Sequence, residues 1–252
     1  MDLRTGNPSG RTRGLLLLHG FGDTPQTLDW MARALHARGY DVRVPLLPGH
    51  GRTIQDFDAS SHTEWIESAL AELLAMRARY GWVALGGLSM GGAIAAVLAG
   101  EVRDIPSLVL MAPYLAMPMH LRIAASSARF WSGRVGPLHS RTERSIHDPV
   151  ERAANLAYGA VTGRALHQLS LVVKEARAAL PRIVAPTLLV QSREDNRIPP
   201  EVARWAIRRI GATRKRLVLT HGAGHIITVD YGREQVVEEV GAWLGSGPGT
   251  AP

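Results

Sequence analysis

A serine set between glycines, after an apolar run and before a stretch of small residues, constrains the fold of this chain more than any other feature. The motif is Gly-Leu-Ser-Met-Gly at 87–91, centred on Ser89. Residues 82–85 before it are apolar, and 93–99 after it are all Ala, Ile, Val or Leu. A strand that turns sharply into a helix needs small residues on both sides of the turn, because the two elements pack closely there. The motif therefore predicts a strand, a tight turn carrying Ser89, and a helix.

Short apolar runs alternate with helical segments along most of the chain. The runs are continuously apolar, as in parallel strands that are covered on both faces. We therefore expect an α/β fold with a doubly wound, mostly parallel sheet and right-handed crossovers. The expected strands cover 15–18, 42–44, 83–88, 108–111, 187–190 and 216–219, and the expected helices cover 27–38, 61–79, 90–100, 200–210 and 235–244.

The interval between the fourth and fifth expected strands is much longer than a crossover needs. Residues 114–181 show helical periodicity interrupted by Pro and Gly, and they predict a small, mostly helical cap inserted over the site face of the sheet. The core would then consist of 1–113 and 182–245. Residues 246–252, rich in Gly and Pro, are expected to form a flexible tail.

Composition narrows the classes of protein and of chemistry that remain. No apolar run approaches the roughly 20 residues of a membrane-spanning helix, so we expect a soluble, cytoplasmic protein without stable membrane insertion. The chain has no Cys, which excludes disulfides and a cysteine nucleophile. Its ten histidines show no metal-binding spacing on one helix face, so we expect no metal and no cofactor.

The formal net charge of +7 raises the question of nucleic-acid binding, and 27 of the 29 basic residues are Arg. The arginines are scattered. Their densest group, at 208–216, is interleaved with apolar residues rather than with stacking aromatics. We interpret this group as a solvated basic face and expect no nucleic-acid partner. The sequence leaves the oligomeric state unknown.

Three side chains follow expected strands in an order that suits nucleophilic catalysis. An attacking serine needs a base to accept its proton, a carboxylate to orient that base, and donors for the oxyanion. Because open α/β sheets place their sites at the carboxyl ends of strands, we expect Ser89, Asp195 and His225 to meet there. The backbone N–H groups of Phe21 and Met90 are the expected oxyanion donors.

Each of the three side chains has an alternative. Ser89 could simply cap the helix that follows, although a cap alone would not need glycines on both sides. Asp195 could cap the next helix, with Glu194 as the acid instead. His221 competes with His225, which we prefer because the glycines beside it let the loop reach the serine.

Other residues near the expected site allow more than one interpretation. His19 and His50 are expected to organise loop hydrogen bonds, and they have some chance of touching substrate. The apolar residues of the cap could line an acyl pocket, or they could equally pack the cap onto the sheet. These cap residues are Met117, Met119, Leu121, Phe130 and Trp131.

Five motifs together resemble the α/β-hydrolase superfamily, over nearly the whole chain. They are His-Gly-Phe-Gly at 19–22, Pro-Gly-His-Gly at 48–51, the Ser89 motif, the Asp195 loop and Gly224-His225. The order Ser, Asp, His is that of α/β-hydrolases and differs from those of chymotrypsin-like and subtilisin-like proteases. Within the superfamily, the Gly-Phe-Gly turn, the segment 224–230 and the modest cap are similar to bacterial carboxylesterases and monoacylglycerol lipases.

This resemblance implies hydrolysis of monoacylglycerols, or of carboxylic esters with short to medium acyl chains, through an acyl-enzyme on Ser89. Other chemistry of the same triad stays open, namely carbon–carbon bond hydrolysis, amide hydrolysis or acyl transfer. A non-catalytic ligand receptor on the same fold also stays open. Substrate contacts are expected from Gly20, Gly22, Met117, Leu121 and Ile226.

Overall fold

A seven-stranded sheet crosses the centre of the computed structural model, which describes residues 1–3, 13–132, 134–139 and 144–246. The strand order is β1-β3-β2-β4-β5-β8-β9, with β1 antiparallel to β3 and the other neighbours parallel. The doubly wound, mostly parallel sheet expected from the sequence is thus confirmed. Its strands are β1 (Asp2–Leu3), β2 (Arg13–Leu18), β3 (Asp41–Arg43), β4 (Trp82–Leu88), β5 (Leu108–Met111), β8 (Thr187–Ser192) and β9 (Lys215–Thr220).

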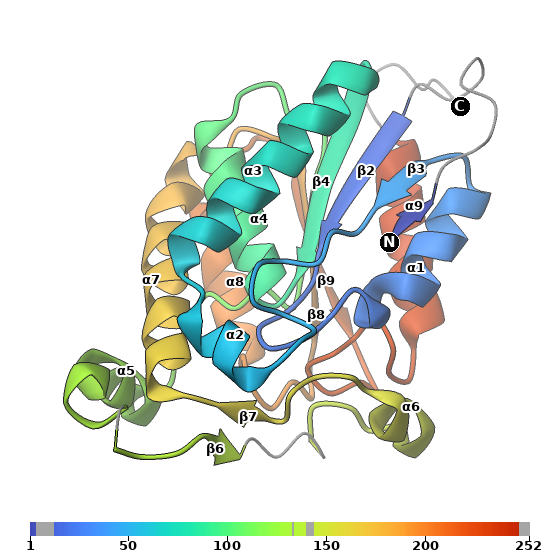
Figure 1. Cartoon of the computed structure of the whole chain (residues 1–252). Helices are drawn as coiled ribbons and strands as arrows, with labels where there is room; N and C mark the ends of the chain where they lie inside the picture. Colours follow the sequence, from blue (N-terminus) through green and yellow to red (C-terminus); the bar gives the residue numbers. More distant parts are fainter. Residues whose placement is uncertain (4–12, 133, 140–143, 247–252) are drawn as a thin grey trace.

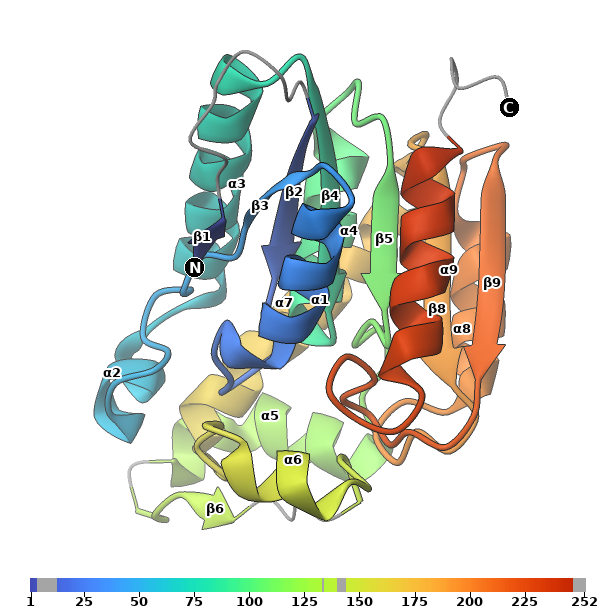
Figure 2. The ribbon, with the colours of Figure 1, turned by 90° about the vertical axis from the view of Figure 1, so that its right-hand side faces the viewer.

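Helices cover both faces of the sheet (Figures 1 and 2). Neighbouring strand residues such as Leu15 and Leu16 belong to the apolar clusters on opposite faces, which explains why the strands are continuously apolar. One face carries α3 (His62–Arg79), α4 (Met90–Glu101), α7 (Gly163–Ala179) and α8 (Pro200–Arg209), and the other carries α1 (Gln26–Ala37) and α9 (Arg233–Gly245).

The long interval before β8 divides into two parts. Its first part lies beyond the carboxyl ends of the sheet strands (Figures 1 and 2), and its described residues, 119–132, 134–139 and 144–161, are called the cap layer below. Its last helix, α7, instead packs beside α4 in the layer of helices on the sheet. The cap layer contains α5 (Met119–Trp131), β6 (Leu138–His139), α6 (Pro149–Ala154) and β7 (Ala160–Val161), and β6 pairs antiparallel with β7.

The domain boundaries expected from the sequence, with a cap at 114–181, stay a prediction. Of the tail expected at 246–252, the part after Ser246 lies outside the described residues. A short helix, α2 (Ile54–Ala59), and a 3-10 turn at Leu180–Arg182 complete the described elements. Along the described ranges, we find no helix with the length and hydrophobicity needed to cross a bilayer.

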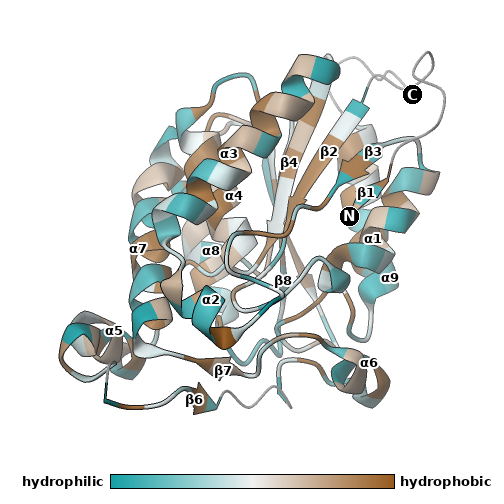
Figure 3. Cartoon of the chain, viewed as in Figure 1, coloured by the Kyte–Doolittle hydropathy of each residue, from teal (hydrophilic) through white to brown (hydrophobic). Residues whose placement is uncertain are grey.

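Two of the cap residues that could line a pocket or pack onto the sheet do not pack onto it. Met119 and Phe130 are 60% and 63% exposed, so core packing is wrong for them, and a role in lining an acyl pocket stays a prediction. Both lie on α5, whose buried residues are instead Ala125 and Ala128. The helical periodicity of this segment gave the correct element, but the face that packs inward is the one with the small residues. Figure 3 shows apolar segments on the elements of the cap layer.

Candidate active site

Ser89 lies between β4 and α4, in a backbone conformation that depends on close packing of the strand and the helix at the neighbouring glycines. Its φ is +55°, in the left-handed region that few non-glycine residues adopt. A Cβ at Gly91 would lie 2.1 Å from the carbonyl oxygen of Leu18, and one at Gly87 would lie 2.3 Å from the carbonyl carbon of Gly91. Both glycines are therefore required for the strand and the helix to approach this closely.

Neighbouring backbone groups hold Ser89 in this conformation. The Ser89 N–H donates to the Met111 carbonyl at 2.9 Å, and the Ser89 carbonyl accepts from the Tyr114 N–H at 2.9 Å. Met111 is the last residue of β5, the strand beside β4, and Tyr114 lies three residues further along the chain. A strained residue persists where the surrounding structure over-determines it, as these two bonds do.

The structure brings the three predicted side chains together at the carboxyl ends of β4, β8 and β9. His225 Nε2 lies 2.7 Å from Ser89 Oγ, and His225 Nδ1 lies 2.7 Å from Asp195 Oδ2. An ionised carboxylate only accepts hydrogen bonds, so Nδ1 carries the proton and Nε2 is left to accept from the serine hydroxyl. All three residues are buried. This geometry can transfer a proton from Ser89 to His225.

The Asp195 carboxylate is fixed by four donors. Oδ1 accepts the N–H groups of Arg197 and Ile198 at 2.7 and 2.9 Å, and Oδ2 accepts His225 Nδ1–H and Gln191 Nε2–H. Burial alone would raise the pKa of Asp195, but His225 and the backbone donors outweigh it and hold the pKa below its ordinary value. Gln191 was not predicted as a site residue, because its only signal in the sequence is that of a polar residue ending an apolar strand.

The alternatives for the acid and the base pair with each other instead. His221 Nδ1 lies 3.2 Å from Glu194 Oε1, and 69% of the His221 side chain is exposed. By contrast, the hydrogen bonds of His225 join it to Ser89 and Asp195. The structure therefore favours the Asp195 and His225 assignments over Glu194 and His221.

A neutral histidine, His19, holds the peptide group that carries the Phe21 N–H in the turn after β2. His19 Nε2 accepts the Leu47 N–H at 3.1 Å, so Nδ1 carries the proton and donates to the Gly20 carbonyl at 2.9 Å. That carbonyl and the Phe21 N–H belong to the same peptide group. Burial, with the nearby His50, lowers the pKa of His19 to about 3, which keeps the ring neutral.

The two loop histidines, His19 and His50, both form hydrogen bonds with the backbone of their loops. His50 Nδ1 lies 2.9 Å from the Pro48 carbonyl, so His19 and His50 do organise loop hydrogen bonds, as predicted. Their contact with substrate stays a prediction. Among the described residues, the N–H groups of Phe21 and Met90 have no hydrogen-bond acceptor.

A second buried carboxylate, Asp23, lies close to the nucleophile and was not predicted. Its oxygens accept the Thr24 N–H at 2.8 Å and the Thr27 hydroxyl at 2.9 Å. A Cβ built on Gly20 would lie 3.6 Å from both Asp23 Oδ2 and Ser89 Cβ. Burial raises the pKa of Asp23 to about 6, against the effect of its hydrogen bonds.

Asp230 ties the cap layer to the loop that carries His225. Oδ2 accepts the N–H groups of Gly224 and His147 at 2.7 and 2.8 Å, and Oδ1 accepts those of Asp148 and Tyr231, both at 2.9 Å. We call this arrangement the Asp230 clamp. Asp230 lies in a motif noted in the sequence, but no role was expected of it, because two of its four partners come from a distant segment without a recognisable signal.

Tyr158 ties the cap layer to the turn that carries Phe21. Its N–H donates to the Gly22 carbonyl at 3.0 Å, and its hydroxyl donates to the Gly49 carbonyl at 3.0 Å. The hydroxyl also accepts the Arg52 N–H at 3.1 Å. The cap layer is therefore bonded to both the base side and the oxyanion side of the site.

The remaining predicted substrate contacts stay predictions. Met117 is half-buried and packs against the core on the α4 face of the sheet, and Ile226 packs against the core on the α1 face. Leu121 is half-buried on α5. Over the same described residues, no three His, Asp or Glu side chains are grouped so as to hold a metal ion.

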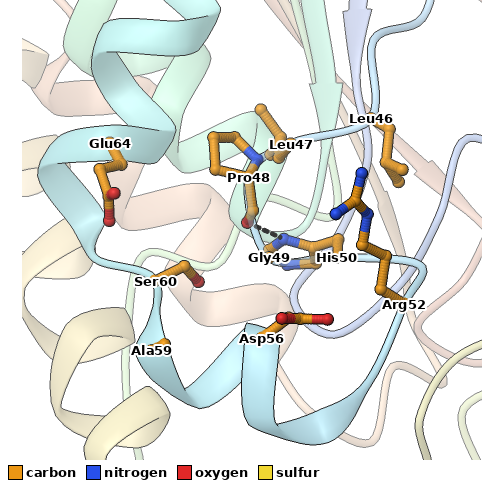
Figure 4. Close-up of a pocket in the computed structure, with 10 residues that line it drawn as sticks. All are labelled: Leu46, Leu47, Pro48, Gly49, His50, Arg52, Asp56, Ala59, Ser60 and Glu64. Carbon is orange, nitrogen blue, oxygen red and sulfur yellow. Dashed lines mark hydrogen bonds between the residues drawn. The ribbon is translucent and has the colours of Figure 1, made fainter.

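A pocket of about 430 Å³ lies beside the site rather than at it (Figure 4). It opens between the loop after β3 and the short helix α2, and none of Ser89, Asp195 and His225 lines it. His50 connects the two places, because its ring packs edge-on against His19 with centroids 5.0 Å apart. The pocket is lined by Leu46, Leu47, Pro48, Gly49, His50, Arg52, Asp56, Ala59, Ser60 and Glu64.

Known proteins are similar to this chain in sequence and in architecture. A family model described as serine aminopeptidase, S33, matches residues 11–231. The chain is 29% identical to the thermostable monoacylglycerol lipase of Bacillus sp. (strain H-257), over 89% of this chain and 87% of that protein. It is 26% identical to the carboxylesterase of Bacillus subtilis (strain 168), over 93% of each. A solved structure from work on the metagenome-derived lipolytic enzymes LipS and LipT matches with a TM-score of 0.87 and 27% identity, over 97% of this chain and 96% of that one.

Proposed function

The chain belongs to the serine aminopeptidase S33 family of α/β-hydrolases, and on that basis we propose that it is a serine hydrolase of carboxylic esters. Its substrates would be monoacylglycerols or esters with short to medium acyl chains. The observation that carries this proposal is the unbroken series of hydrogen bonds from Ser89 Oγ through His225 to Asp195. The relatives named monoacylglycerol lipase and carboxylesterase support an ester rather than an amide as the substrate.

The proposed reaction has two halves. As Ser89 Oγ attacks the ester carbonyl, His225 Nε2 takes its proton, and the N–H groups of Phe21 and Met90 bind the oxyanion. His225 then gives the proton to the leaving alcohol, which leaves an acyl-enzyme on Ser89. Water next loses a proton to His225 and attacks the acyl carbonyl, and the proton returns to Ser89 as the acid departs. Asp195 orients His225 and stabilises the imidazolium in both halves.

Substitution of Ser89→Ala tests the proposal with a soluble substrate, p-nitrophenyl butyrate. We expect kcat to fall by at least about 10⁴-fold, because the variant lacks the hydroxyl that lies within hydrogen-bonding distance of His225. Ser126→Ala, on the exposed face of α5, is the matched control and should turn over like the wild type. Unchanged turnover in Ser89→Ala would contradict the assignment. A fluorophosphonate should label the wild type at Ser89 and leave the variant unlabelled.

Substrate profiling separates the ester hydrolase from its alternatives. A series of p-nitrophenyl esters and monoacylglycerols would define the preferred acyl length. Faster turnover of p-nitroanilides or diketones, or transfer to added alcohols, would favour the other triad chemistries. Failure of both turnover and labelling would favour a ligand receptor. The cytoplasmic location and the absence of a nucleic-acid partner stay predictions.

A further inference from the structure

The cap layer carries most of the large apolar side chains that the described surface exposes. Three of them form a stripe on α5, at helix positions that lie on one face. Exposed apolar side chains scattered singly are ordinary, but a concentration of them marks an interaction site. Of the eleven such residues in the described ranges, seven belong to the cap layer: Met119, Ile123, Phe130, Val135, Leu138, Val150 and Leu156.

The apolar stripe is flanked by unpaired positive charge. The Arg122 guanidinium donates to Met119 Sδ at 3.3 Å, and the Arg129 guanidinium carbon lies 4.5 Å from the centre of the Phe130 ring. Within the described structure, neither guanidinium forms an ion pair, whereas several arginines elsewhere pair with carboxylates. The sequence has no Asp or Glu anywhere in 105–142. This surface is therefore both apolar and cationic.

The stripe faces outward at the end of the molecule where the site lies. α5 packs on α7, with Ala125 and Ala128 buried, so its opposite face is left open. Both views place α5 beyond the carboxyl ends of the strands, the edge at which Ser89 and His225 meet (Figures 1 and 2). A molecule held against this face would lie at the end of the protein where the candidate nucleophile lies.

We propose that the outer face of α5 docks the protein reversibly onto an anionic lipid surface. Met119, Ile123 and Phe130 would enter the boundary between headgroups and acyl chains, while Arg122 and Arg129 bind lipid phosphates. The charge selects this partner over a second copy of the chain, because two such faces would repel each other. Docking goes beyond the proposed function, since it needs no chemistry at Ser89.

Flotation of the purified protein with vesicles tests the proposal. We expect strong partition onto phosphatidylcholine vesicles containing 30% phosphatidylglycerol, weaker partition onto pure phosphatidylcholine, and weakening of the former in 0.5 M NaCl. The double variant Arg122→Gln/Arg129→Gln should lower the partition onto anionic vesicles about twenty-five-fold, since each juxtamembrane arginine adds about fivefold. Ile123→Ser/Phe130→Ser should lower it by roughly tenfold or more.

Matched variants away from the cap layer provide the controls. Arg208→Gln/Arg209→Gln on α8 removes the same charge, and Leu74→Ser on α3 removes an exposed apolar side chain, so both should bind vesicles like the wild type. Ser89→Ala should also bind normally, which separates docking from hydrolysis. Equal partition of the α5 and control variants would overturn the proposal. Salt-independent binding to neutral vesicles, or a dimer in solution that the α5 variants abolish, would overturn it as well.

Discussion

Ser89 places its hydroxyl toward His225 only because two glycines let a helix start against a strand. Holding a non-glycine residue at a positive φ costs roughly 1–3 kcal/mol, which the surrounding packing and hydrogen bonds must offset. The backbone bonds to Met111 and Tyr114 supply part of this restraint. The nucleophile is therefore positioned by backbone contacts as much as by its own side chain.

Gly91→Ala tests this dependence at the scale of one methyl group. The new Cβ would lie 2.1 Å from the Leu18 carbonyl oxygen, so β2 or α4 must move and carry Ser89 with it. We expect kcat/KM on a soluble ester to fall about a hundredfold, as a displacement near 1 Å can cause, together with a lower melting temperature. Gly81→Ala is the control, because a Cβ there meets nothing within 4 Å. Wild-type kinetics in Gly91→Ala would contradict this account of the turn.

At the scale of elements, the site residues lie on loops that follow sheet strands, and hydrogen bonds from the cap layer hold two of these loops in place. The Asp230 clamp joins the segment before α6 to the His225 loop, and Tyr158 joins the segment after α6 to the Phe21 turn. The segment with α6 is thus bonded to the core on both sides. Among the described residues, α5 forms no such hydrogen bonds to the loops of the site, and it packs mainly on α7.

Asp230→Asn tests the clamp. An amide offers one acceptor oxygen, so it can keep two of the four N–H bonds and turns its own N–H groups toward the other two donors. We expect the free energy of unfolding to fall by about 2–4 kcal/mol and kcat to fall more than KM changes, because the His225 loop loses its restraint. Asp29→Asn, at an exposed ion pair, should change neither. A kcat equal to that of the wild type would show that the clamp does not position His225.

Features that depend on neighbouring residues could be predicted from the sequence better than features that depend on residues far apart in the chain. Apolar periodicity located six strands and the main helices to within a few residues, because each leaves a local pattern. The two-residue β1 was missed, since so short a strand has no period. Asp230 and Tyr158 were missed as site residues because the cap layer and the core segments that they join are distant in sequence. Gln191 was missed although Asp195 lies only four residues further on, because a single polar residue at a strand end forms no pattern. The outward faces of Met119 and Phe130 depend on which side of α5 meets α7, which the chain does not encode locally.

At the scale of the whole molecule, buried histidines make stability depend on pH. His19 and His50 are buried neutral, and burial lowers their pKa values to about 3 and about 4, from 6.5. Below pH 6.5 both histidines are protonated in the unfolded chain. In the native chain they stay neutral until the pH falls to about 4 for His50 and about 3 for His19. Asp23 acts in the opposite direction, because burial raises its native pKa to about 6 from 3.8. Between pH 6 and 4 the unfolded chain therefore holds about one proton more than the native chain.

Urea unfolding at pH 7, 6, 5 and 4 should reveal this difference. We expect the free energy of unfolding to fall on acidification between pH 6 and 4, by on the order of 1 kcal/mol per pH unit. In His50→Gln the unfolded chain no longer gains a proton at position 50, and the opposite effects of His19 and Asp23 nearly cancel. The free energy of unfolding of this variant should therefore hardly change between pH 6 and 4. Stability that rises on acidification in the wild type would contradict the neutral state of these histidines.

The distance along the chain between the partners at the site has a consequence for how the protein folds. His225 meets a serine 136 residues before it, and Asp230 meets His147 across 83 residues. Such contacts close long loops, whose entropic cost is met only after nearer contacts have formed. During refolding from denaturant, helical signal should therefore return first, and the ability to react with a fluorophosphonate last.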